Sequence, residues 1–150
     1  MMENTIIDII DTDKNLIYTG KKKFTKKQVQ DLFLSINWIS GQYPNRLYKA
    51  LMNSSTVITV WHGEKLVGLA RVIDDSELVA FLHYVLVHPD YQGKGIAGQM
   101  LKMIIEKYKD YLYIEGMPEE SKNAAFYKKF GFKVMEDGVA MQRCNFNNKS

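Results

Sequence analysis

A glycine-rich segment that follows an apolar run is the part of the sequence best suited to binding a phosphate group. It reads HPDYQGKGIAG over residues 88–98 and ends with the spacing Gly-x-Gly-x-x-Gly. Glycine allows an anion to approach the backbone closely, and a helix that begins at Gly95 would present unpaired amide N–H groups and a positive dipole end. Gln92 and Lys94 can add side-chain donors at the rim. The segment therefore predicts a pyrophosphate site that does not need a metal.

Two well-known phosphate-binding motifs do not fit this segment. A P-loop requires a glycine where this chain has His88, and a Ser or Thr after Lys94 where it has Gly95. A dinucleotide-binding fingerprint places its first glycine directly after the strand, whereas here the residues HPDYQ follow Val87. The chain after Glu115 is also too short for the further βαβ units that such a sheet needs. Both motifs are excluded.

The segment instead resembles the acetyl-CoA loop of the GNAT superfamily of N-acetyltransferases, whose pattern is Gln/Arg-x-x-Gly-x-Gly/Ala. Gln92, Gly95 and Ala97 fill this pattern in register. A second stretch, NAAFYKKFGF at residues 123–132, is similar to the later motif of the superfamily, a helix that ends in Tyr-x-x-x-Gly-Phe. Weaker similarity extends over residues 57–144. The two motifs occur in the order and at the spacing that the superfamily has.

The resemblance implies an enzyme that moves an acetyl group from acetyl-CoA to a primary amine by direct attack in a ternary complex. The amine would be a small molecule or an exposed amino group of a peptide. A non-catalytic module that binds acyl-CoA is the alternative. The residues expected to bind the coenzyme, through backbone or side chain, are Val85, Leu86, Val87, Gln92, Gly93, Lys94, Gly95, Ile96, Ala97, Gly98 and Asn123.

Acetyl transfer to an amine requires a proton donor for the leaving thiolate and an acceptor for the proton of the amine. The resemblance places the general acid at Tyr127, with Asn123 four residues earlier on the same helical face. The base stays open, because this chain has Phe81 where some members have a strand glutamate. His83, whose ordinary pKa lies near neutrality, Glu115 acting through water, and a water chain without a side-chain base are the candidates.

The acceptor amine is expected to bind beneath the two early helices. Trp38, Tyr43 and Tyr48 are the large amphipathic side chains there, and Tyr43 is the candidate contact.

Hydrophobic periodicity places these residues on alternating strands and helices. The predicted strands are 15–20, 56–61, 66–73, 78–87 and 111–116, with a closing pair at 132–136 and 139–144; the predicted helices are 25–41, a short one from 44, 95–108 and 121–130. Strict alternation along the fourth strand would put Phe81, His83 and Val85 on one face. We therefore expect an α/β (α+β) fold in one domain, residues 1–150, with a mixed, mostly antiparallel sheet of about seven strands and about four flanking helices.

Composition narrows the class of partner. Apolar residues make up 46% of the chain and charged residues 25%, and the net charge is only +3, which is too weak to argue for nucleic acid. No membrane span or signal peptide is predicted. One cysteine and three scattered histidines do not suggest a zinc site. We expect a cytoplasmic protein with no metal, no nucleic-acid partner and no membrane partner, and the sequence leaves open whether it is a monomer or a homodimer.

Overall fold

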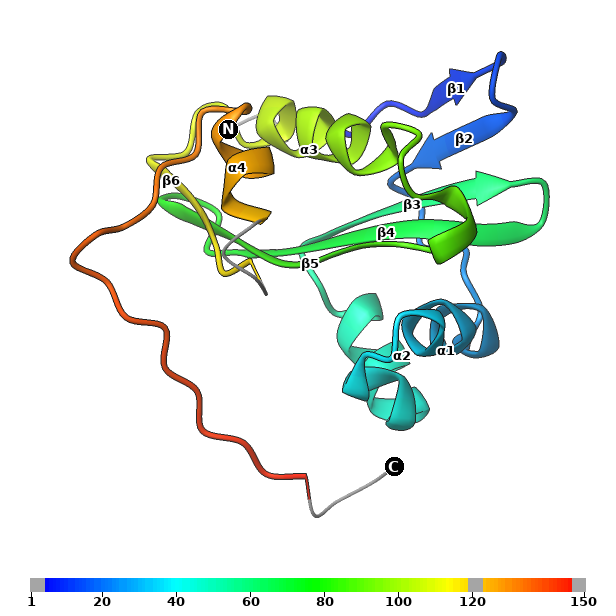
Figure 1. Cartoon of the computed structure of the whole chain (residues 1–150), viewed down its shortest axis with the longest axis horizontal. Helices are drawn as coiled ribbons and strands as arrows, with labels where there is room; N and C mark the ends of the chain where they lie inside the picture. The colour runs from blue at the N-terminus through cyan, green and yellow to red at the C-terminus, as the bar shows by residue number, and fades with distance from the viewer. Residues whose placement is uncertain (1–4, 119–122, 147–150) are drawn as a thin grey trace.

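A single mixed sheet organises the computed structural model, which describes residues 5–118 and 123–146. Its strands follow chain order: β1 (Ile9–Asp11), β2 (Leu16–Thr19), β3 (Thr56–His62), β4 (Lys65–Asp74), β5 (Val79–Val87) and β6 (Tyr113–Gly116). All neighbours are antiparallel except β5 and β6, which are parallel (Figure 1). The predicted α/β class with a mostly antiparallel sheet is confirmed.

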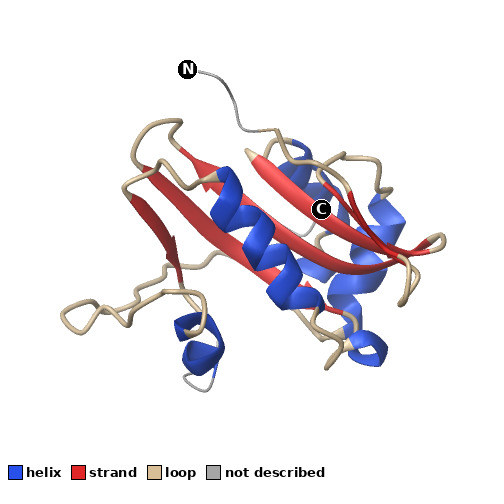
Figure 2. Cartoon of the chain, turned by 90° about the horizontal axis from the view of Figure 1, so that it is seen from above, coloured by secondary structure: helices blue, strands red, loops and turns tan. Residues whose placement is uncertain are grey.

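Helices cover both faces of the sheet. On one face lie α1 (Lys26–Ser35) and α2 (Pro44–Met52), joined by the short helix η1 (Ile39–Gln42). On the other face lie α3 (Ile96–Lys107), preceded by η2 (Pro89–Tyr91), and α4 (Asn123–Lys128). Figure 2 shows α3 lying over the strands, with α1 and α2 behind the sheet. Within the described ranges, no helix is long and apolar enough to cross a bilayer.

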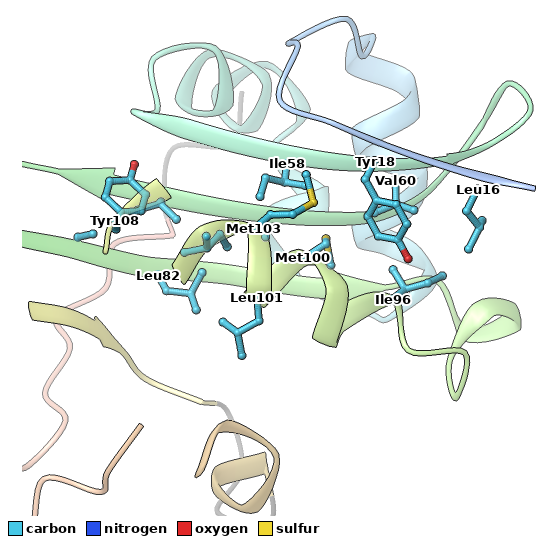
Figure 3. Close-up of a cluster of buried hydrophobic side chains, with 14 of the residues drawn as sticks. Leu16, Tyr18, Ile58, Val60, Leu82, Ile96, Met100, Leu101, Met103 and Tyr108 are labelled. Carbon is cyan, nitrogen blue, oxygen red and sulfur yellow. The ribbon is translucent and has the colours of Figure 1, made fainter. Parts of the chain in front are cut away.

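Two hydrophobic cores hold these layers together. Ile96, Met100, Leu101 and Met103 of α3 pack against sheet residues such as Ile58, Val60 and Leu82 (Figure 3). On the opposite face, Val29, Leu32 and Phe33 of α1 and Leu47 and Leu51 of α2 pack against residues such as Leu69 and Leu86. The central strands are thus covered on both faces, which explains why their sequences are continuous apolar runs rather than alternating ones.

The start of α1 is as predicted, but its end is not. The Gln28 amide donates to Thr25 Oγ1 at 3.1 Å and the Thr25 amide donates to Gln28 Oε1 at 2.8 Å, so the capping box is present. The helix stops at Ser35 rather than at Gly41, because Asn37 adopts a left-handed conformation with φ 60° and reverses the chain. Gly41 instead lets η1 pack closely, since a Cβ there would lie 2.9 Å from the Leu34 side chain.

The described sheet has six strands where about seven were expected, and the predicted strands differ from it at both ends of the described chain. β1 was not predicted, because it has only three residues and little periodicity. The expected closing strands, residues 132–136 and 139–144, do not pair with any described strand, although the Gly138 amide closes a turn onto the Met135 carbonyl at 3.1 Å. This segment leaves the sheet and extends to the α1/α2 layer (Figure 1). A high strand propensity indicates that a segment is extended, but it does not determine which strand the segment pairs with.

Candidate functional site

The glycine-rich loop forms an open cradle at the start of α3. Gly93 and Gly95 have φ angles of 79° and 80°, in the left-handed region that favours glycine. A Cβ at either position would meet nothing within 4 Å, so the space over the loop is open. The first helical hydrogen bond runs from the Gln99 amide to the Gly95 carbonyl, which leaves the amides of residues 96–98 without intrahelical partners. The cradle therefore offers donors and a positive dipole end to an anion.

Close packing fixes this cradle against the sheet and against α4. Ile96 is only 2% exposed, and a Cβ at Gly68 of β4 would lie 3.1 Å from its Cγ2. On the other side, a Cβ at Gly98 would lie 3.3 Å from Cζ of Phe130, just after α4. Two glycines thus bring the first turn of α3 directly onto β4 and the end of α4 directly onto α3.

Basic side chains surround the rim of the cradle. Lys94 Nζ lies 5.3 Å and Lys65 Nζ 5.5 Å from the centre of the Tyr91 ring, within cation–π range. His62 Nδ1 lies 2.7 Å from the Tyr91 hydroxyl, and Lys14 Nζ donates to the Lys94 carbonyl at 2.7 Å. Lys94 thus contacts Tyr91 and Lys14 at the loop, its binding role stays a prediction, and Tyr91 is a supporting residue that sequence reasoning missed.

Next to the cradle, β5 has a backbone edge that β6 does not cover. β6 pairs with β5 only from Val79 to Leu82, and residues 83–87 continue beyond it. The Gln92 side chain donates to the Val87 carbonyl at 3.1 Å and so ties the loop to this part of the strand. The remaining backbone groups of Val85, Leu86 and Val87 lie where the resemblance implied that an extended ligand would pair.

A β-bulge at His83 interrupts β5 where the two strands separate. Arg71 of β4 pairs with Tyr84 while its neighbour Val72 pairs with Leu82, so His83 is an extra residue. The prediction that His83 shares a face with Val85 was therefore wrong: Val85 packs in the α3 layer, whereas the His83 ring lies 4.1 Å from the Tyr84 ring, which packs with the α1/α2 layer. Strict alternation cannot foresee an inserted residue.

Arg71 determines the protonation of His83. Its Nη1 lies 2.8 Å from His83 Nδ1. A guanidinium only donates, so Nδ1 must accept and the neutral ring carries its proton on Nε2. Although part of the ring reaches solvent, desolvation and the nearby charge of Arg71 lower the pKa of His83 below its usual 6.5. His83 is thus a hydrogen-bond donor near neutral pH.

Tyr127 lies on α4 and Glu115 lies on β6. Tyr127 is half-buried against the α3 core, between the rings of Phe126 and Phe132, and desolvation raises its pKa. Its hydroxyl therefore stays protonated at neutral pH. Half-buried Glu115 is the register partner of Phe81, two residues before the bulge. Asn123 is exposed on the first turn of α4, one turn before Tyr127.

Tyr43 belongs to the α1/α2 layer. It is only 8% exposed, at the start of α2, and its hydroxyl donates to the Phe146 carbonyl at 2.9 Å. Its role at an acceptor site stays a prediction.

Arg71 is also a residue that sequence reasoning missed. The available signal was a single charge within the apolar run LVGLARVI.

Comparison with known proteins identifies the family of the chain. Residues 26–132 match the family model described as Acetyltransferase (GNAT) family. The chain belongs to the GNAT family of acetyltransferases. It is 30% identical over 131 residues to the uncharacterized N-acetyltransferase ycf52 of Pyropia yezoensis, covering 84% of this chain and 75% of that protein. It is 27% identical to ycf52 of Porphyra purpurea, with the same coverage. These matches identify a GNAT N-acetyltransferase.

Solved structures support the same fold. The GNAT-family protein SP0256 of Streptococcus pneumoniae TIGR4 superposes with a TM-score of 0.75 at 24% identity, covering 87% of this chain and 98% of that one. SA2161 of meticillin-resistant Staphylococcus aureus superposes with a TM-score of 0.76 at 21% identity, with coverages of 87% and 99%.

The GNAT assignment implies use of acetyl-CoA, and the cradle fits its pyrophosphate because the loop is open and lined by amides. Across residues 5–118 and 123–146, no group of three or more His, Cys, Asp and Glu side chains could hold a metal ion. Catalysis without a metal stays a prediction.

A charge placed in the cradle should abolish coenzyme binding. Gly95→Asp would set a carboxylate beside the pyrophosphate, whereas Gly95→Asn has the same shape without the charge. Both must adopt φ near 80° and should cost about 1 kcal/mol of stability. Calorimetry with coenzyme A should show that Asp weakens binding at least about 10-fold more than Asn, as expected for one unfavourable charge contact. Equal affinities of the two variants would contradict the site.

Proposed function

We propose that the protein transfers the acetyl group of acetyl-CoA to a primary amine by direct attack in a ternary complex. The observation that carries the proposal is the juxtaposition of an open amide cradle at Gly93–Gly98 with the uncovered backbone edge of β5. The cradle suits a pyrophosphate, and the strand edge suits an amide-containing arm that extends from it. The acceptor is a small amine or an exposed amino group.

The pyrophosphate and the pantetheine arm of the coenzyme each have candidate binding residues. The amides of residues 96–98 and the side chain of Lys94 would hold the pyrophosphate, and Gln92 keeps the loop attached to β5. The backbone of residues 85–87 would bind the pantetheine arm, with Asn123 as a side-chain donor. Acetyl-CoA supplies an acetyl group already activated as a thioester.

Tyr127 would act as the general acid. The raised pKa of its hydroxyl keeps the proton on the residue throughout the physiological range. The hydroxyl can then donate this proton to the departing sulfur, which is expelled more readily as a thiol. The position of Tyr127 on α4, whose end contacts the first turn of α3 through Phe130 and Gly98, supports this role.

Glu115 suits the role of base better than His83 does. Protonating His83 on Nδ1 would place two donors opposite each other, because Arg71 already donates to that atom. Glu115 carries only acceptors when ionised and lies on the strand next to the bulge. We infer that Glu115 takes the proton of the amine, directly or through water, and that His83 donates a hydrogen bond from Nε2.

Removing the Tyr127 hydroxyl should slow turnover without weakening coenzyme binding. Tyr127→Phe keeps the ring contacts with Phe126 and Phe132. Because a positioned proton donor contributes roughly 10²–10⁴-fold, kcat should fall by about that factor. Thiol release gives kcat, and calorimetry gives the coenzyme A affinity. An unchanged kcat would mean that another group is the acid. Wild-type protein that binds coenzyme A but acetylates no amine would indicate the non-catalytic module instead.

Glu115→Gln and His83→Gln should have different effects. Glu115→Gln should lower kcat/KM by about 10²-fold or more, as expected for loss of a base. His83→Gln should keep the rise of kcat/KM with pH. The folded pKa of His83 lies below its unfolded value, so the folded state binds fewer protons between the two and stability rises with pH in that window. His83→Gln should therefore flatten the dependence of Tm on pH below about 6.5.

Two other outcomes would contradict the assignment of Glu115 as the base. If His83→Gln removes the rising limb of kcat/KM while Glu115→Gln retains it, His83 is the base. If neither variant changes the profile, titration of the amine itself sets the rate.

A further inference from the structure

Arg71 is a half-buried cation that has only neutral partners among the described residues. Its Nε donates to Ser54 Oγ and its Nη1 to His83 Nδ1, both at 2.8 Å, and its guanidinium carbon lies 5.5 Å from the centre of the Tyr84 ring. No carboxylate forms an ion pair with it in residues 5–118 and 123–146. A partly desolvated guanidinium without a counter-ion favours binding of an anion.

Arg71 lies near the proposed reaction site. It pairs across the sheet with Tyr84, which directly follows the bulge at His83. The bulge in turn follows Leu82, the last residue of β5 that β6 covers. The guanidinium lies on the sheet face covered by α1 and α2, since the Tyr84 ring that it contacts packs there. It is thus one strand away from the edge where β5 and β6 separate.

The surroundings combine this charge with aromatic surface. The Tyr84 ring lies 5.7 Å from Trp38, and the His83 ring lies 6.0 Å from Phe81. The Tyr84 hydroxyl is 2.7 Å from Ser40 Oγ, so that ring is held in place. One cation and one imidazole N–H are set among aromatic rings, an arrangement that can recognise a small organic anion.

We propose that the acceptor amine also carries a carboxylate, which Arg71 binds through its planar fork with His83 Nε2–H as a second donor. The inference rests on the proposed acetyl transfer and names its substrate class: an amino acid, or an amine that resembles one. A guanidinium suits a planar carboxylate because two N–H groups can donate to its two oxygens in parallel.

Matched acceptors test the claim directly. L-phenylalanine, phenylalaninamide and phenethylamine form one set; L-lysine, lysinamide and cadaverine form another. The α-amine of the amides is less basic than that of the acids. A larger fraction of it is therefore neutral at neutral pH, which by itself favours the amides over the acids. Wild-type protein should nevertheless show the highest kcat/KM for the free acids, after correction for the fraction of neutral amine. Equal or lower values for the acids would overturn the proposal.

Variants at Arg71 locate the effect. Arg71→Gln should lower kcat/KM for the acids by about 10- to 100-fold, the usual effect of losing a hydrogen bond to a charged group, and should affect the decarboxylated amines much less. Arg71→Lys should restore part of the loss, because the charge returns without the fork. Arg46→Gln removes an exposed cation of α2 and serves as the control. Equal losses for acids and decarboxylated amines would indicate a merely structural role.

A binding measurement separates failure of this proposal from failure of acetyl transfer. If no amine is acetylated although coenzyme A binds, acetyl transfer itself fails. Titration of L-phenylalanine into the coenzyme-loaded protein, followed by NMR, still tests the anion site. Binding that Arg71→Gln abolishes supports it, and absence of binding overturns it.

A separate observation concerns the C-terminal arm, defined here as residues 133–146. All of its residues are exposed, including the apolar side chains of Val134, Met135, Val139, Met141 and Phe146. Apart from the turn that Gly138 closes, it is extended, and its pattern predicted two strands. β6 is the last strand of the sheet, and its outer edge also has no strand partner in the described chain. Exposed apolar surface and unpaired strand edges both favour association.

The arm and the β6 edge are complementary but do not meet within the described chain. The arm runs from α4 to the α1/α2 layer, where Tyr43 holds the Phe146 carbonyl (Figure 1). A second copy of the chain offers both an arm and an edge, so two reciprocal pairings satisfy both copies under two-fold symmetry. We infer a homodimer in which each arm adds a strand to β6 of the partner subunit.

Proline substitutions in the arm test the dimer without disturbing the packed domain. Ala140→Pro with Met141→Pro removes adjacent backbone donors, so one loss falls on the pairing side whichever way the strand faces. Both residues are exposed. Light scattering after gel filtration should give a dimer for the wild type and for the Ala140→Ser, Met141→Gln control, and a monomer for the proline variant. A monomeric wild type, or a dimer that survives both prolines, would overturn the inference.

Discussion

The β-bulge at His83 is the constraint on which the candidate site depends. One extra residue in β5 lets Val85 face the α3 layer while Tyr84 and Leu86 face the α1/α2 layer. It occurs directly after Leu82, where β6 stops pairing. The same insertion therefore aims the side chains of the strand and coincides with the start of the uncovered backbone edge.

Two close packing contacts, at Gly68 and at Gly98, then position α3 and α4 relative to that edge. Gly68 allows Ile96 to sit on β4, which fixes the first turn of α3 and its free amides. Gly98 allows Phe130 to contact the same turn, which fixes the end of α4 near the cradle. Because Tyr127 lies on α4, the proposed acid and the proposed phosphate site are positioned through one helical turn.

The electrostatics of the site favour neutral donors. Desolvation raises the pKa of Tyr127, and desolvation together with Arg71 lowers that of His83, so both are uncharged at neutral pH and both can donate a hydrogen bond. Glu115 then provides the acceptor and Arg71 the fixed charge. This division of roles follows from which groups are buried together, and it is consistent with proton donation to sulfur and with recognition of an anionic acceptor.

Local chemistry in the sequence determined much of this protein. The helix start at Thr25, the apolar central strands and the glycine loop before α3 each depend on residues close together in the chain, and each was predicted. Tertiary structure alone decided the bulge at His83, the pairing of Arg71 and the course of the C-terminal arm. These features depend on which partner a segment meets across the sheet. Periodicity records the preference of a segment for burial or extension, but register and strand pairing are set by contacts distant in sequence.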